Sequence, residues 1–151
     1  MIKVNVEINN QSWHKKIRYP KKYLNTKLNK IFRNIKFFKN KDLVFTILLT
    51  NSVKMKKLNK KFRKKNKSTD VLSFPSTSSY GLKYIRKKNF YLGDIAVSYE
   101  IVNSRSKKNN FFYEFDKVWV HGFLHLVGYD HIKNKDYFKM DKIEKRILNL
   151  I

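Results

Sequence analysis

Three of the four histidines of this 151-residue chain lie within one short segment, HGFLHLVGYDH (residues 121–131). Two histidines four residues apart lie on one face of a helix, so His121 and His125 can direct ring nitrogens at one point. Gly128 can adopt a left-handed conformation that ends the helix and returns His131 to the same point. The spacing predicts one zinc ion, Zn2+, held by His121, His125 and His131, with a fourth position for water as in catalytic sites.

The zinc prediction depends on the complete pattern of three histidines and Gly128. His121 and His125 alone would be typical of an ordinary helix face. The chain has no cysteine, so a zinc ion must be held by His, Asp or Glu side chains. The fourth histidine, His14, lies outside the pattern beside Trp13. We interpret it as an ordinary surface or packed residue.

The identity of residue 122, a glycine, limits the reactions that the histidine motif can catalyse. The histidine spacing is that of the zinc-protease signature HExxHxxGxxH, in which the second residue is the glutamate that deprotonates water. Glycine cannot act as that base, so peptide hydrolysis lacks an expected catalytic group. Zinc still polarises phosphoryl oxygens and lowers the pKa of bound water toward about 7. A phosphodiester substrate is therefore compatible with the motif.

The formal charge of +24 favours a polyanionic partner, which could be RNA, DNA or an anionic membrane. The chain is also rich in Lys, Asn, Ile and Phe, as an AT-biased genome would produce without selection for binding, so the charge selects among partners only weakly. No apolar run is long enough to span a membrane, and the N-terminus does not resemble a secretory signal. We expect a cytoplasmic protein with no membrane partner.

The hydrophobic pattern predicts the elements that must position the histidines. The expected strands are Ile2–Ile8, Leu43–Leu49, Thr69–Phe74 and Tyr91–Val97. The expected helices are one opened by Pro20 with apolar positions up to Phe38, one from Asn51 or Ser52 to about Lys65, and those at Asn110–Val127 and Asn134–Leu150. We expect a single α/β (α+β) domain over residues 1–151, with a mixed, roughly four-stranded sheet packed by helices and the histidine motif on an active-site helix and turn. Residues 76–89 are expected to form a surface loop.

Three details of burial follow from the same pattern. The continuous apolar run Leu43–Leu49 predicts a central strand buried on both faces. The basic helix after it is expected to turn three apolar side chains inward: Val53, Leu58 and Phe62. The last helix is expected to place four on one side: Phe138, Ile143, Ile147 and Leu150.

Three segments resemble the YbeY family of bacterial rRNA maturation factors, which are metal-dependent single-strand endoribonucleases. They are HGFLHLVGYDH, LNKKFRKKNKSTDVLSFP (residues 58–75) and LGDIAVS (residues 92–98). They cover the second half of the chain in order, whereas the first 50 residues match only in length and strand-helix pattern. The resemblance implies that His121, His125 and His131 are the zinc ligands. It also implies that Arg63, at the position of the family's functionally important arginine, acts on substrate.

A guanidinium can pair with two phosphate oxygens and stabilise charge that develops on them, so this role is chemically reasonable for Arg63. Only the family register separates Arg63 from the other cations of KMKKLNKKFRKKNK (residues 54–67). Asp70 is expected to form a turn or cap at a strand start, and the resemblance leaves a supporting site role open. Asp130 could equally orient a ligand imidazole or serve the turn before His131. The resemblance also implies that Asp94 borders the cleft.

The leading hypothesis is a zinc-dependent, single-strand-specific endoribonuclease. The resemblance implies that it acts in rRNA maturation, notably at the 3′ end of 16S rRNA, and in ribosome quality control, with rRNA and the small ribosomal subunit as partners. Attack by zinc-activated water and attack by a neighbouring 2′-hydroxyl both remain open. The alternatives are a non-catalytic ribosome assembly factor in which zinc only braces the fold, and a metallopeptidase or amidohydrolase, against which Gly122 argues.

Overall fold

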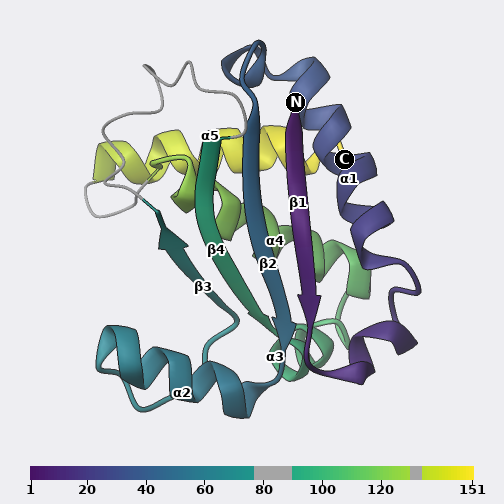
Figure 1. The fold of residues 1–151 in the computed structure, drawn as a ribbon, viewed down its shortest axis with the longest axis vertical. Helices are drawn as coiled ribbons and strands as arrows, with labels where there is room; N and C mark the ends of the chain where they lie inside the picture. The colour runs from purple at the N-terminus through teal and green to yellow at the C-terminus, as the bar shows by residue number, and fades with distance from the viewer. Residues whose placement is uncertain (77–89, 130–133) are drawn as a thin grey trace.

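The computed structural model describes residues 1–76, 90–129 and 134–151, and these form a mixed sheet packed by helices (Figure 1). The strands are β1 (Ile2–Ile8), β2 (Leu43–Thr50), β3 (Val71–Pro75) and β4 (Phe90–Ser98). The α-helices are α1 (Pro20–Asn34), α2 (Ser52–Arg63), α3 (Tyr99–Arg105), α4 (Phe111–Leu126) and α5 (Asn134–Leu148). Short 3-10 helices occur at Gln11–Lys15 and Lys36–Phe38. The predicted α+β class with a four-stranded mixed sheet is confirmed.

The sheet has the strand order β1-β2-β4-β3. β1 and β4 run parallel to β2, whereas β3 runs antiparallel to β4. The start of β3 therefore lies beside the end of β4, with Val71 paired to Val97. The segment that follows α2 thus leads into the edge strand β3, which also contacts α4.

The two faces of the sheet are covered unequally. In Figure 1, α4 and α5 lie behind the sheet, and α2 lies below the lower end of β3. The larger core includes Phe45, Ile47 and Ile95 from the strands, with Trp119 and Phe123 from α4. On the other face, a small cluster contains Met55, Leu72 and Ala96.

This asymmetry corrects the expectation that β2 is buried on both faces. Leu43, Phe45 and Ile47 are fully buried, but the alternating residues Val44 and Thr46 are only partly buried. The reason is that α2 covers only part of the second face. The continuous apolar run therefore predicted a central strand correctly, but it did not predict that one face of the strand is only partly buried.

Two helix faces also differ from prediction. In α2 the buried residues are Met55 and Asn59, whereas Val53 is 66% and Phe62 55% exposed. Asn51 caps this helix by accepting a hydrogen bond from the Lys54 N–H at 2.8 Å. From that start, the helical phase turns Met55 and Asn59 toward the sheet.

In α5, Phe138 is 67% exposed, whereas Met140 and Ile147 are buried against the core. Leu150 lies beyond the end of this helix. Near the N-terminus, α1 ends at Asn34, and Phe38 is buried from the 3-10 helix that follows. Within the described parts of the chain, no helix has the length and apolar character needed to cross a membrane.

Helix α4 lies very close to the sheet at Gly122. A Cβ built on Gly122 would lie 2.9 Å from Val71 Cγ2, 3.0 Å from Ile95 Cγ2 and 3.1 Å from Ser73 Oγ. The Ser73 hydroxyl donates a hydrogen bond to the Gly122 carbonyl oxygen at 3.1 Å. Glycine thus allows direct contact between α4 and strands β3 and β4, and a longer side chain at this position would push them apart.

Gly122→Glu should therefore lower the free energy of unfolding by about 3 kcal/mol or more, because it adds volume and an unpaired carboxylate to a packed contact. Urea denaturation measures this change. Tyr113→Glu, on an exposed position of the same helix, is the matched control and should have little effect. Equal stability of the wild type and Gly122→Glu would contradict the close packing described here.

Candidate active site

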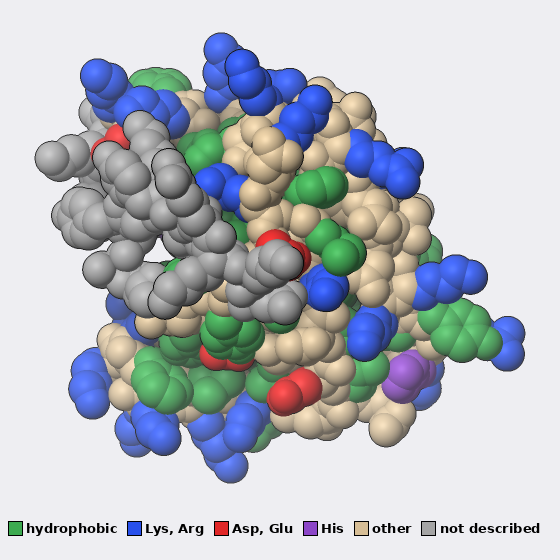
Figure 2. All heavy atoms as spheres, turned by 45° about the horizontal axis from the view of Figure 1, so that its top comes forward, with side chains coloured by type: hydrophobic (Ala, Val, Ile, Leu, Met, Phe, Trp, Pro, Cys, Tyr) green, Lys and Arg blue, Asp and Glu red, His purple; other side chains and the backbone are tan. Residues whose placement is uncertain are grey.

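A cavity of about 590 Å³ opens between β3, α3, α4 and α5. Its wall includes eight charged or imidazole side chains: Arg63, Asp70, Arg105, Glu114, Lys117, His121, His125 and Glu144. On the face shown in Figure 2, Lys and Arg side chains are scattered rather than gathered into one patch. The candidate site is therefore located from the side chains grouped in the cavity.

His121 and His125 lie one turn apart on α4 and converge as their spacing predicts. Their Nε2 atoms are 3.2 Å apart, and both side chains line the cavity. Two nitrogen ligands of a tetrahedral zinc ion, each bonded at 2.0–2.1 Å, lie about 3.3 to 3.4 Å apart. The two imidazoles thus fit two adjacent positions of such a site in both donor type and separation.

The rest of the predicted metal site is only partly described. Helix α4 ends at Leu126, and Gly128 has a φ of 91°, the positive value expected for a glycine that ends the helix. His131 and Asp130 lie outside the described residues. Among the residues that are described, no three His, Cys, Asp or Glu side chains form a group able to hold a metal ion. The three-histidine ligand set therefore stays a prediction.

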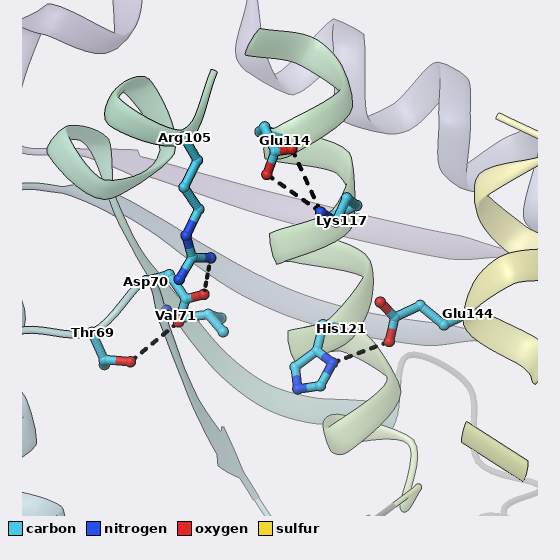
Figure 3. Close-up of polar contacts among 8 residues, drawn as sticks. All are labelled: Thr69, Asp70, Val71, Arg105, Glu114, Lys117, His121 and Glu144. Atoms are coloured by element: carbon cyan, nitrogen blue, oxygen red, sulfur yellow. Dashed lines mark hydrogen bonds and ion pairs between the residues drawn. The ribbon is translucent and has the colours of Figure 1, made fainter. Parts of the chain in front are cut away.

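Glu144 is a site residue that the sequence analysis missed. It projects from α5 toward the His121 ring, and its Oε2 atom lies 3.1 Å from His121 Nδ1 (Figure 3). The two residues are 23 positions apart and belong to different helices. No local spacing in the sequence connects them, and Asp130 was the candidate for such an orienting role.

Asp70 lies at the start of β3 and joins several elements at the cavity wall. It accepts hydrogen bonds from the Val71 N–H at 2.8 Å and from the Thr69 hydroxyl at 3.1 Å, as a residue at a strand start is expected to do. It also forms an ion pair with Arg105 of α3 at 2.5 Å, which the sequence did not predict (Figure 3). Burial by itself would raise the pKa of Asp70, but Arg105 and the two other donors hold it below its usual value.

Lys117 lies one helical turn before His121 on α4. Its Nζ atom is 3.5 Å from both carboxylate oxygens of the buried Glu114. With Arg63 from α2 and Arg105 from α3, it contributes a positive charge to the wall of the same cavity. The structure thus brings Arg63, the predicted substrate residue, into the cavity that contains the two histidines.

The structure does not bring Asp94 to this cavity. Ile95 of β4 packs toward Gly122 of α4, so the preceding residue faces the opposite side of the sheet. Asp94 lines a separate groove with Glu7 and accepts a hydrogen bond from the Tyr91 hydroxyl at 2.6 Å. The expectation that Asp94 borders the cleft fails because of strand alternation.

The comparisons with known proteins agree with this arrangement of motifs. Residues 7–151 match the family described as Endoribonuclease YbeY. The chain is 46% identical over 155 residues to the Endoribonuclease YbeY of Pelagibacter ubique, covering 100% of this chain and 97% of that protein. It is 33% identical over 162 residues to the Endoribonuclease YbeY of Thermodesulfovibrio yellowstonii, covering 98% of each.

A similar fold is found among solved structures. The solution structure of a Thermotoga maritima protein superposes with a TM-score of 0.60 at 27% sequence identity. The match covers 98% of this chain and 87% of the other.

The ion pair of Asp70 predicts a pH dependence of stability. Because the pKa of Asp70 is lower in the folded protein, its contribution to stability is present above the unfolded value of about 3.9 and is lost as the pH falls through the folded value. Asp70→Asn should therefore destabilise the protein at pH 7, and its difference from the wild type should shrink below about pH 4. Urea denaturation across this range measures the difference. A difference that does not change with pH would contradict the ionic contribution.

Proposed function

Because the chain belongs to the YbeY endoribonuclease family, we propose that it is a zinc-dependent enzyme that cleaves single-stranded RNA in the cavity beside α4. The observation that carries the proposal is the 3.2 Å separation of the Nε2 atoms of His121 and His125 in a cavity also lined by cationic side chains. His131, by the motif spacing, is the third proposed ligand. Three imidazoles suit zinc, and they leave an open position for water or substrate.

Bound at this position, zinc would supply a Lewis acid for a phosphoryl oxygen and would acidify a water molecule. The side chains of the cavity wall have their own part in the mechanism. Arg63 is proposed to pair with the phosphate oxygens of the cleaved bond and to stabilise the charge that grows on them. Lys117 and Arg105 are placed to hold neighbouring phosphates, because they line the same cavity. The net charge of +24 would speed the approach of RNA.

The biological substrate proposed here is rRNA of the small ribosomal subunit, with maturation of the 16S rRNA 3′ end as the specific reaction. A role in ribosome quality control and a place in the cytoplasm belong to the same proposal. All of these rest on family membership. The metallopeptidase alternative is disfavoured because Gly122, at the position of the protease glutamate, packs against Val71 and Ile95 with no space for a side chain.

The proposal is tested by incubating purified protein with an end-labelled single-stranded RNA and measuring the metal content of the same sample. We expect zinc-dependent cleavage by the wild type and none by His125→Ala, because that variant lacks one ligand. Products with 2′,3′-cyclic phosphate ends would indicate attack by the neighbouring 2′-hydroxyl. RNA that stays intact with zinc-loaded wild type, on single-stranded and ribosomal substrates, would instead favour the non-catalytic assembly factor.

Arg63→Ala should reduce the cleavage rate by about 100-fold to 1,000-fold, the usual cost of removing one group that stabilises developing charge. Its zinc content should equal that of the wild type, because Arg63 is not a proposed ligand. The matched control is Lys60→Ala, which removes an exposed cation from the same helix and should have a small effect. Similar RNA cleavage rates for Arg63→Ala and Lys60→Ala would contradict a specific role of Arg63 in catalysis.

A further inference from the structure

The position of Glu144 is fixed by the packing of α5 against the core of the protein. Met140 and Ile147, four residues before it and three after it, are buried and belong to the main core. Residues at these spacings share one face of a helix, so the face that carries Glu144 is the face packed against the body of the protein. The Glu144 side chain is only 22% exposed, and it lines the cavity that contains His121.

The contact between Glu144 and His121 affects both the tautomer and the orientation of the His121 ring. When Nδ1 carries the proton and donates it to the Glu144 carboxylate, Nε2 keeps its lone pair. The same contact limits rotation of the ring, and Nε2 then lies 3.2 Å from His125 Nε2. In that tautomer, the nitrogen proposed to bind the metal keeps a free lone pair and faces the second proposed ligand, His125.

The position of Glu144 distinguishes it from a ligand. Its carboxylate contacts Nδ1, whereas the two histidines converge through their Nε2 atoms. Nδ1 and Nε2 are separated by a ring carbon, and the directions in which they form hydrogen bonds or metal bonds diverge. Glu144 thus contacts the ring nitrogen of His121 that is not directed at the proposed metal site.

We propose that Glu144 is a positioning residue that holds His121 in the tautomer and rotamer required for metal binding, so that docking of α5 against α4 sets the affinity of the site. The choice of zinc as the bound ion rests on the proposed function. Carboxylates in this position raise metal affinity by orienting a histidine ligand and increasing its basicity. The structure assigns this role to a residue of α5, outside the histidine motif.

The first test measures the zinc dissociation constant of the full chain by competition with a chromophoric chelator. Glu144→Ala should weaken zinc binding by about 10-fold to 100-fold, the usual effect of losing such a partner. Glu144→Gln should weaken it less, because the amide oxygen still accepts the Nδ1 proton but carries no charge. The control is Asp141→Asn on the same helix, whose carboxylate pairs with Lys145 at 2.8 Å, and it should leave the constant unchanged.

The second test reads the tautomer of His121 in the metal-free protein by long-range ¹H–¹⁵N correlation NMR at about pH 8, where a histidine of ordinary pKa is neutral. His121→Ala identifies the signals of this ring. The wild type and Glu144→Gln should carry the proton on Nδ1, and Glu144→Ala should shift population toward the form with the proton on Nε2.

Two results would overturn the inference. One is a wild-type His121 with its proton on Nε2. The other is a folded Glu144→Ala variant that binds zinc as tightly as the wild type, even if its thermal stability is lower, because Glu144 would then only dock the helix. A wild type that binds no zinc would contradict the proposed function, while the tautomer would still decide whether Glu144 controls His121.

Discussion

The arrangement of the site depends on the close approach of helix α4 to strands β3 and β4. At Gly122 the distance leaves no space for a Cβ atom, and the Ser73 hydroxyl donates to the helix backbone there. With Gly122 facing the sheet, the neighbouring His121 and, one turn later, His125 line the cavity. The same contact places the start of β3, with Asp70, opposite these histidines. A single glycine thus couples the packing of the fold to the position of its two converging imidazoles.

Two cations of the cavity wall come from separate helices and are paired with carboxylates. Arg105 of α3 pairs with Asp70, and Lys117 of α4 lies near the buried Glu114. Ion pairs of this kind restrict long side chains before a substrate arrives, which reduces the entropy lost when an anion binds. Arg105 and Lys117 are therefore held at the cavity wall by contacts within the protein.

Much of the fold could be predicted from local pattern. Alternation in Ile2–Ile8 and helical spacing around the histidines indicated the elements that the structure contains, and the spacing of His121 and His125 indicated their convergence. Burial was harder to predict, since Val53 and Phe62 are apolar but the phase of α2 turns them to solvent. Local patterns do not determine how elements pack against one another. For this reason Glu144 and Arg105, which reach the cavity through contacts distant in sequence, were missed, and Asp94 was assigned to the wrong face.

A crystal structure of the zinc-loaded protein with anomalous data at the zinc edge tests the central claim most directly. The account predicts one strong anomalous peak at about 2.0 to 2.1 Å from the Nε2 atoms of His121 and His125, the usual zinc–nitrogen distance, with His131 as the third ligand. A zinc peak distant from these two rings, or rings that diverge in the loaded protein, would contradict it.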